Sequence, residues 1–278
     1  MKAYDDRVYT SKPKVVSQLK QRDPKEETSV SKNSSVSYKL FQGDCLELMK
    51  NIPDGSIDMI LCDLPYGTTR NKWDSIIPLD RLWEQYERII KDNGCIALFA
   101  QTPFDKVLGV SNLKLLKYEW IWEKDNGTGF INAKKMPLKL HENILIFYKK
   151  LPTYNPQMRK GFKPYSQKNG RGSSNYGEQI RVVTENNGDR YPVDIIAFKR
   201  DRDKLHPTQK PVALLEYLIK TYTSESETVL DNCMGSGSTG VACANSNRRF
   251  IGMELEEKYF KLAKQRIEGA FQNQEERE

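Results

Sequence analysis

The sequence predicts an α/β fold built on a doubly wound, mostly parallel sheet. Short apolar runs alternate with helical patterns from residue 37 onward, which is typical of strands joined by helices. A glycine-rich turn joins one of these runs to a helical pattern near the C-terminus, and carboxylates stand where runs end, at Asp63, Asp231 and Glu254. Strands bounded by helices in this order favour parallel pairing, with helices packed on both faces of the sheet.

The first half of the pattern extends from residue 37 to residue 150. A helical period occupies residues 79–94, and we expect Gly94 to act as the C-cap of that helix. Apolar runs bounded by polar residues or glycine predict strands within residues 37–44, 56–63, 95–100, 118–124 and 143–150.

The second half of the pattern, in residues 206–278, contains the glycine-rich turn. Apolar runs predict strands within residues 227–233 and 249–255. Helical patterns occupy residues 211–223, 237–246 and 257–271.

Two segments depart from this pattern. Residues 1–36 are polar and charged with almost no apolar period, so we expect an N-terminal extension that is mobile or docks on the surface. Residues 151–205 are rich in Gly, Pro, Asn, Arg and Tyr and interrupt the alternation of strands and helices. The length of 278 residues then fits one large domain with an insertion.

Composition favours a polyanionic partner and gives no sign of a metal site. The formal net charge is +7 and the pI is near 9.0, which favours nucleic acid, although many basic proteins bind none. The five cysteines form no CxxC pair and the histidines number two, so neither zinc nor a disulfide framework is indicated. Because no apolar stretch approaches the roughly 18 residues of a membrane span and no signal peptide is recognisable, we expect a cytoplasmic protein with no membrane contact.

The insertion is the candidate surface for nucleic acid. Residues 151–205 hold eleven Lys or Arg against six Asp or Glu. Lysine and arginine neutralise phosphates, and tyrosine, asparagine and glutamine stack on or read bases. The alternative is a solvated loop without a partner. The candidate DNA-binding residues are Arg159, Lys160, Lys163, Lys168 and Arg171.

The turn "VLDNCMGSGSTG" predicts a site for an adenosine-bearing cofactor. Gly235, Gly237 and Gly240 satisfy G-x-G-x-x-G between a strand and a helix, and Glu254 follows nineteen residues after Gly235. Glycines admit close approach of a ligand, and an acid at that distance accepts hydrogen bonds from ribose hydroxyls. The residues alone leave NAD, S-adenosylmethionine and a plain turn open. NAD is disfavoured because only one further strand follows the loop, but a permuted dehydrogenase stays open.

The stretch "DLPY" at the end of an apolar run has the groups that methyl transfer to an exocyclic amine requires. Asp63 can accept one amine N–H and the carbonyl of Leu64 the other, which makes the nitrogen more tetrahedral and stabilises its developing charge. Pro65 restricts Leu64 to extended conformations, and Tyr66 offers a face on which an extruded base can stack. A strand followed by a proline turn is the simpler alternative.

Taken together, "DLPY", "HPTQKP" (206–211) and "MGSGSTG" resemble the motifs of the amino-group DNA methyltransferases, in the order of that family's beta arrangement. The resemblance implies a Rossmann-like doubly wound methyltransferase sheet with circularly permuted motif order. It implies a catalytic half in residues 37–150, a small inserted target-recognition region in residues 151–205 and a cofactor-binding half in residues 206–278.

The resemblance also assigns residues to S-adenosylmethionine and to catalysis. Asp63, Leu64, Pro65 and Tyr66 would be catalytic, and the charge of Lys210 suits the cofactor carboxylate. Leu64 and Cys233 depart from the family, which has proline and phenylalanine there; neither change removes a reacting group. The cofactor residues would be Asp44, Cys45, His206, Pro207, Thr208, Gln209, Lys210, Asp231, Gly235, Ser236, Gly237 and Glu254.

The implied reaction is methylation of the adenine N6 amine in double-stranded DNA, on a flipped-out base. Asp63, where the family's cytosine enzymes tend to have serine, favours adenine over the N4 amine of cytosine. Methylation of the five-position carbon of cytosine is excluded, because that family's nucleophile is a cysteine after proline and no cysteine here follows one. A DNA-binding module with weak or lost catalysis, and an RNA or protein amine methyltransferase, remain alternatives. A homodimer and a cognate restriction enzyme are left open.

Overall fold

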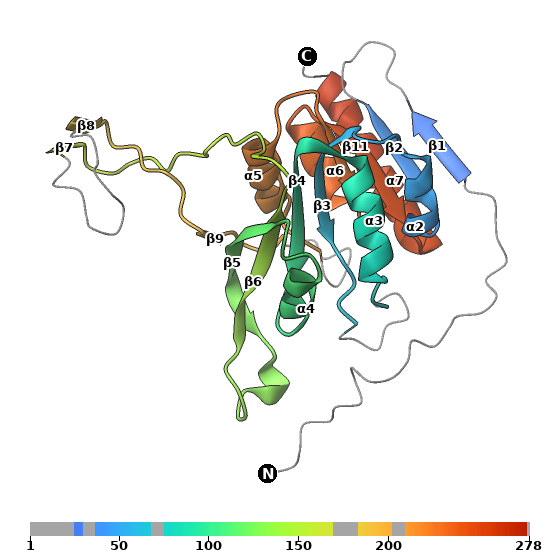
Figure 1. The fold of residues 1–278 in the computed structure, drawn as a ribbon, viewed down its shortest axis with the longest axis horizontal. Helices are drawn as coiled ribbons and strands as arrows, with labels where there is room; N and C mark the ends of the chain where they lie inside the picture. The colour runs from blue at the N-terminus through green and yellow to red at the C-terminus, as the bar shows by residue number, and fades with distance from the viewer. Residues whose placement is uncertain (1–24, 30–36, 68–74, 169–182, 202–208, 277–278) are drawn as a thin grey trace.

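A computed structural model describes residues 25–29, 37–67, 75–168, 183–201 and 209–276. In these residues, a nine-stranded sheet lies between two layers of helices (Figure 1). The predicted α/β class and doubly wound sheet are confirmed. Of the described helices, none is both long and apolar enough to cross a membrane.

Five neighbouring strands of the sheet are parallel, and strands of mixed direction flank them. At one edge, β1 is antiparallel to β2; at the other, β6 is antiparallel to both β4 and β5, and β9 is parallel to β5. The parallel strands are β2 (Tyr38–Gln42), β11 (Arg249–Glu254), β10 (Thr228–Asp231), β3 (Ile57–Asp63) and β4 (Ile90–Ala100). The flanking strands are β1 (Lys25–Ser29), β6 (Lys139–Phe147), β5 (Leu116–Thr128) and β9 (Ile195–Ala197).

The two halves of the chain meet in the middle of the sheet, where β3 and β10 are parallel neighbours. From this junction β3 leads outward to β4, and β10 leads outward to β11 on the other side. Such a reversal of winding opens a crevice at the carboxyl ends of the central strands. Asp63 ends β3 and Asp231 ends β10, so the fold places both carboxylates at this crevice.

Helices cover the two faces of the sheet because neighbouring side chains of each strand point to opposite faces. In β3, Met59 and Leu61 belong to one core, and Ile60 and Cys62 belong to the other. The first core packs against α5 (Val212–Tyr222), α6 (Ser238–Asn245) and α7 (Glu257–Glu275). The second packs against α2 (Cys45–Leu48), η1 (Met49–Asn51), α3 (Leu79–Ile89) and α4 (Phe104–Ser111).

The prediction that Gly94 caps the helix after residue 79 was wrong. Helix α3 ends at Ile89, and Ile90 is already extended and begins β4. Gly94 lies inside this strand, where a Cβ would come within 2.9 Å of the Asp58 carbonyl oxygen. The glycine therefore permits close strand packing, a requirement that looks the same in sequence as a helix stop.

The insertion contributes β9 to the main sheet and also forms a separate small sheet. Strands β7 (Tyr165–Lys168) and β8 (Val183–Asn186) pair antiparallel and project from the body (Figure 1). Near their base, the guanidinium of Arg190 lies 4.6 Å from the ring centre of Tyr165 and 5.3 Å from that of Phe162. The predicted N-terminal extension contributes β1, which docks as an edge strand of the main sheet.

Candidate active site at the carboxyl ends of β3 and β10

Asp63 is the central acceptor of the site. Its Oδ1 accepts a hydrogen bond from the Tyr66 hydroxyl at 2.6 Å, and its Oδ2 pairs with the ammonium of Lys210. The Tyr66 ring is stacked on Phe104, with ring centres 5.2 Å apart. Leu64 is buried, and Pro65 lies at the half-buried surface of the same turn. All four predicted catalytic residues therefore lie at the end of one strand, with both carboxylate oxygens engaged.

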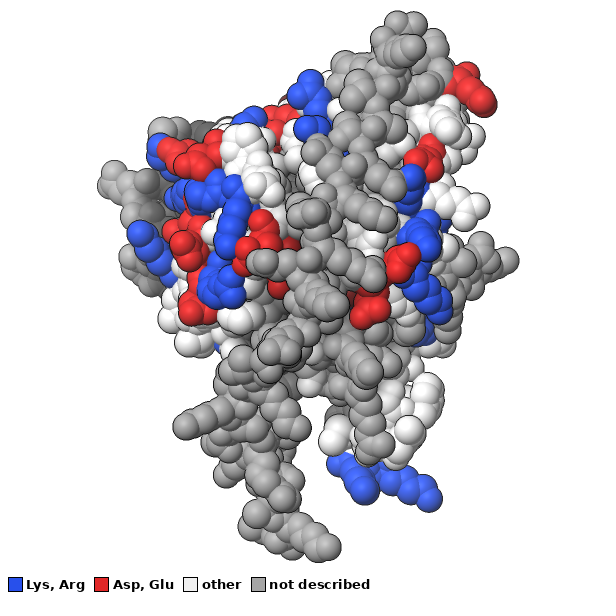
Figure 2. Space-filling model, turned by 90° about the vertical axis from the view of Figure 1, so that its right-hand side faces the viewer, with Lys and Arg blue, Asp and Glu red and all other residues white. Residues whose placement is uncertain are grey.

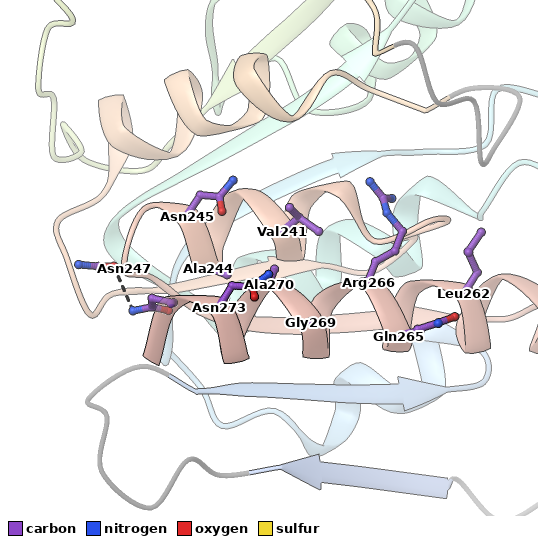
Figure 3. A pocket seen from close by; sticks show the side chains of 11 residues that line it. Val241, Ala244, Asn245, Asn247, Leu262, Gln265, Arg266, Gly269, Ala270 and Asn273 are labelled. Carbon is purple, nitrogen blue, oxygen red and sulfur yellow. Dashed lines mark hydrogen bonds between the residues drawn. The ribbon is translucent and has the colours of Figure 1, made fainter. Parts of the chain in front are cut away.

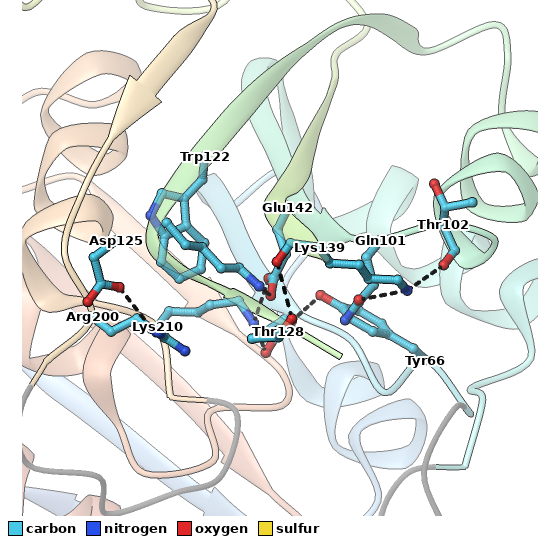
Figure 4. A network of polar contacts seen from close by, with 12 residues as sticks. Tyr66, Gln101, Thr102, Trp122, Asp125, Thr128, Lys139, Glu142, Arg200 and Lys210 are labelled. Atoms are coloured by element: carbon cyan, nitrogen blue, oxygen red, sulfur yellow. Dashed lines mark hydrogen bonds and ion pairs between the residues drawn. The ribbon is translucent and has the colours of Figure 1, made fainter. Parts of the chain in front are cut away.

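A chain of buried charges links Asp63 to side chains of β6 and β5, and Figure 4 shows two of its members, Lys210 and Glu142. The Lys210 ammonium lies 3.3 Å from Glu142 Oε2 as well as contacting Asp63, and the ammonium of Lys124 donates to Glu142 Oε1. The side chains of Lys124, Glu142 and Lys210 are each less than a tenth exposed, and that of Asp63 is 21% exposed. The charges alternate in sign along the chain, which is how buried ions are tolerated.

Sequence reasoning missed Glu142 and Lys124. Both lie in the antiparallel strands β5 and β6, and Trp122 faces Glu142 in the register. Their signal was a charge beside apolar runs, in "WIWEK" and "HENILIF", where a strand buried on both faces should carry none. That signal does not show which site the charges serve.

Burial and neighbouring charges act in opposite directions on these groups. Burial raises the pKa of Asp63; the Lys210 ammonium opposes this, and the charge of Glu142 reinforces it. For Glu142 burial also raises the pKa, but the ammonium groups of Lys210 and Lys124 outweigh burial and the pKa is lowered. Burial lowers the pKa of Lys210, and the two carboxylates outweigh it, so that pKa is raised. Glu142 and Lys210 are therefore held in their charged forms.

The glycine loop and Glu254 meet as the sequence predicted. Gly235 and Gly237 have φ values of +52° and +80°, in the left-handed region that favours glycine. Gly237 is the N-cap residue of α6, and a Cβ there would lie 3.0 Å from Ala263. Glu254 Oε2 accepts the Gly235 N–H at 2.9 Å, so the acid at the end of β11 fixes the loop from below. Gly235 is partly exposed, and Ser236 and Gly237 are buried.

Asp231 and Glu254 are the carboxylates that suit a cofactor with O–H and N–H donors. Burial raises the pKa of Asp231 to about 6 and that of Glu254 to about 7. Asp231 accepts hydrogen bonds from the Thr239 hydroxyl at 2.6 Å and from the Cys233 N–H at 3.1 Å. Neither carboxylate forms an ion pair with any described residue. Each of these carboxylate oxygens accepts one hydrogen bond from the protein and has capacity for another. This set of acceptors fits the hydroxyl and ammonium groups of a nucleoside that carries an amino acid.

Other predicted cofactor residues surround these two acids. Asp44 caps α2 by accepting the Leu46 N–H at 2.8 Å, and the preceding Gly43 N–H bonds to the Glu254 carbonyl at 3.0 Å. Cys45 is buried at the start of α2. Ser236 donates to the Gln209 side chain at 3.4 Å, which brings the end of "HPTQKP" to the glycine loop.

Some predicted residues are placed elsewhere or not described. Lys210 contacts Asp63 and Glu142, and its predicted contact with a cofactor carboxylate stays a prediction. His206, Pro207, Thr208 and Arg171 lie outside the described residues. Arg266, which sequence reasoning missed, donates from α7 to the carbonyl of Ser236 in the glycine loop.

The described residues of the predicted DNA-binding set are Arg159, Lys160, Lys163 and Lys168, and none of them forms a hydrogen bond or ion pair with Asp63. Arg159, Lys160 and Lys163 are exposed, and Lys168 ends β7. The Arg159 Nε donates to the Tyr191 carbonyl at 3.1 Å, and its guanidinium lies over Phe162. Arg159 is therefore partly committed to holding the insertion together.

A groove of about 820 Å³ lies between α6 and α7 (Figure 3). Val241, Asn245 and Arg266 are among the residues that line it. It includes none of the predicted cofactor or catalytic residues. The groove is therefore distinct from the crevice at the carboxyl ends of the strands.

The fold and the crevice at the ends of β3 and β10 define an α/β enzyme with an acid at the end of one strand and a glycine-rich loop after its neighbour. The DNA methylase family model of N6 and N4 methyltransferases matches residues 57–265, and the chain belongs to this family. The resemblance inferred from the motifs is thereby confirmed.

Individual relatives agree with this assignment. The chain is 29% identical to the type II methyltransferase M.HpaI of Haemophilus parainfluenzae, covering 85% of this chain and 76% of that protein. It is 28% identical to the DNA adenine methyltransferase YhdJ of Escherichia coli (strain K12), covering 83% of each. The crystal structure of the M1.HpyAVI–SAM complex has a TM-score of 0.57 and 27% identity, covering 82% of this chain and 99% of that one.

Proposed function

We propose that this protein transfers a methyl group from S-adenosylmethionine to the N6 amine of adenine in duplex DNA, acting on a base turned out of the helix. The observation that supports it most directly is the parallel pairing of β3 with β10, which sets Asp63 beside Asp231 and the glycine loop. Similarity to YhdJ, named a DNA adenine methyltransferase, and the acid at position 63 favour adenine.

The cofactor would be held by the residues already described. S-adenosylmethionine supplies an electrophilic methyl group on a sulfonium. The raised pKa values of Asp231 and Glu254 reflect buried carboxylates that gain from bound O–H or N–H donors. The glycine loop admits the cofactor without side-chain obstruction, and Gln209 and Ser236 close the site on the side of "HPTQKP".

The target amine has to replace a partner of Asp63, because both of its oxygens are already engaged. The Tyr66 hydroxyl is neutral and the Lys210 ammonium is charged, so the hydroxyl is the weaker partner. The amine therefore takes Oδ1 of Asp63, Tyr66 turns toward the base, and Lys210 stays on Oδ2. Asp63, whose Oδ1 would face the amine, would accept the proton that the nitrogen gives up on methylation.

In this scheme the aromatic ring of Tyr66 stacks on the base, and its hydroxyl has no role in the transfer. Tyr66→Phe should retain much of the activity, because its hydroxyl is displaced before transfer and the stacking face is kept. Tyr66→Ala should slow transfer, because the base then loses that face. Single-turnover methylation of a duplex compares the two variants.

Expression in a methylation-free host, followed by single-molecule sequencing of the DNA, tests the reaction. The parent should place N6-methyladenine at one sequence motif, and Asp63→Ala should reduce it about a hundredfold or more. A signal on cytosine N4 would favour the alternative that the family also contains. Binding of S-adenosylmethionine and DNA without any methylation would favour a DNA-binding module that has lost catalysis.

The insertion at 151–205 is proposed as the target-recognition region, supported by its basic residues and its projection from the sheet (Figure 1). Neutralising Arg159, Lys160 and Lys163 should weaken binding to all sequences and flatten its salt dependence. The N-terminal extension, a homodimer, a cognate restriction enzyme and a cytoplasmic location stay predictions.

A further inference from the structure

The hairpin between β5 and β6 ends in an ordered turn with apolar side chains on its surface. Phe130 is 69% exposed, Ile131 is 98% exposed and Met136 is 53% exposed. The turn is held by backbone hydrogen bonds, from Asn132 N–H to Gly129 O at 2.9 Å and from Met136 N–H to Asn132 O at 3.0 Å. These apolar side chains are therefore presented on a built turn rather than on a loose loop.

The hairpin tip, residues 129–138, lies beyond the catalytic edge of the sheet. Strand β5 runs in the same direction as β3, because β3 is parallel to β4 and β6 is antiparallel to both β4 and β5. In the register, Asp63 lies level with Trp120, and Thr128 comes eight residues later. The register shifts between Glu123 and Thr128, so the advance along the sheet is that of β6, where Lys139 lies five residues from Ile144. At about 3.3 Å per residue, the paired hairpin extends roughly 16 Å past Asp63 on the side from which a base must enter.

The residue that directly follows the tip is hydrogen-bonded to the turn after β4. The Lys139 ammonium donates to the Gln101 side chain at 3.3 Å and to the Thr102 carbonyl at 3.2 Å, in the turn after β4 (Figure 4). Figure 4 shows these groups beside Tyr66. The position of the tip is therefore coupled to the catalytic turn.

Charge at the tip favours a polyanion as the occupant. Residues 127–140 contain Lys134, Lys135 and Lys139 and no carboxylate. Figure 2 shows the contrast: acidic and basic side chains are interspersed over the body, and the described part that extends lowest is white and blue. Apolar side chains flanked by lysine are the chemistry with which proteins enter between base steps while holding phosphates.

We propose that residues 129–138 form an apolar wedge that enters duplex DNA beside the target base and stabilises the gap left when that base turns out. Phe130 and Ile131 contact the exposed base stack, and Lys134 and Lys135 contact phosphates. This role rests on the proposed function and adds to it a second DNA-contacting element, separate from residues 151–205.

Two DNA substrates distinguish an effect of the wedge on base extrusion from an effect on DNA binding in general. With Phe130→Ala plus Ile131→Ala, kcat/KM on a fully paired duplex should fall about tenfold or more. The reason is that no apolar side chains then occupy the gap that the extruded base leaves in the duplex. On the same duplex with an abasic site opposite the target adenine, the loss should shrink to about threefold or less, because an unpaired base turns out easily. The control is Val110→Ala plus Leu113→Ala, exposed apolar residues near the opposite end of β5, which should leave both rates unchanged.

The lysines are tested by binding alone. Lys134→Gln plus Lys135→Gln should reduce the slope of log affinity against log salt by about 0.9 for each phosphate that is no longer neutralised, whereas Lys114→Gln plus Lys117→Gln should not. Melting temperature and S-adenosylmethionine affinity check that each variant is folded.

Several outcomes would overturn the wedge. These are equal losses on both duplexes, no loss on either, or an unchanged salt slope. A wedge variant that converts a dimer to a monomer in light scattering would show a protein interface instead. A parent that methylates no DNA would refute the proposed function, and the salt slope would still decide whether the tip contacts DNA.

Discussion

The ammonium of Lys210 pairs with Oδ2 of Asp63, a residue 147 positions earlier in the sequence. The same ammonium also pairs with the carboxylate of Glu142. This arrangement fixes the carboxylate in one orientation and leaves its second oxygen to an exchangeable hydroxyl. The proposed amine acceptor is therefore oriented by a residue outside "DLPY".

Replacing Lys210 with Met should slow methyl transfer about a hundredfold at neutral pH and shift its pH dependence. Burial already raises the pKa of Asp63, and removal of the opposing ammonium raises it further. Because the acceptor has to be ionised, the acid limb of the rate profile should move to higher pH. Single-turnover rates at several pH values give the position of the acid limb, and Lys150→Met, whose ion pair with Asp92 is exposed on both sides, is the control. A variant that is slower but whose acid limb lies at the same pH as the parent's would contradict this electrostatic role.

Glu142→Gln should destabilise the fold by about 3 kcal/mol, because two buried ammonium groups then lose their shared counter-charge. The pKa of Glu142 is lowered by those groups in the folded state, so its contribution is present above the ordinary glutamate pKa and is lost as pH falls below it. Denaturant unfolding at pH 7 and at pH 4 should show a smaller difference between variant and parent at pH 4. Glu47→Gln, whose ion pairs are exposed, should change stability by less than about 0.5 kcal/mol.

The affinity for S-adenosylmethionine should increase as pH rises through about 7, the raised pKa of Glu254. Burial raises that pKa, so the carboxyl is largely protonated below this value and accepts ribose hydrogen bonds less well. Glu254→Gln keeps an acceptor for the Gly235 N–H and should bind more weakly with a flatter profile between pH 6 and pH 8. Calorimetry on both proteins decides this, and parallel profiles would refute the assignment.

Gly235→Asp should abolish cofactor binding in a folded protein. The substitution puts a side chain in the left-handed conformation at φ +52° and a second negative charge beside Glu254. Gly269→Asp, on α7 where an added Cβ meets no atom within 4 Å, controls for the charge itself. Melting curves establish folding, and retained affinity in a folded Gly235→Asp protein would place the cofactor elsewhere.

The pattern of apolar runs in the sequence predicted the parallel sheet. It also predicted that three carboxylates lie at one edge of that sheet. An apolar run ends at each of the three carboxylates, Asp63, Asp231 and Glu254. Because the carboxyl ends of parallel strands share an edge of the sheet, their proximity could be predicted from the sequence alone. The glycine loop was equally readable, because its φ values demand glycine wherever the chain is placed. Gly94 shows the limit, since a glycine required for close packing resembles one that ends a helix.

The ion pairs between charged residues that are distant in the sequence could be identified only from the tertiary structure. Lys124 and Glu142 look like ordinary polar positions until β5 and β6 pair and Lys210 is delivered between them and Asp63. The exposed tip at Phe130 and Ile131 likewise became meaningful only when the direction of β5 placed it past the catalytic edge. Hydrophobic periodicity records which side of an element is buried, because burial acts on each residue locally. The pairing of one charge with another depends on distances between elements, and those exist only after the strands have taken their order in the sheet.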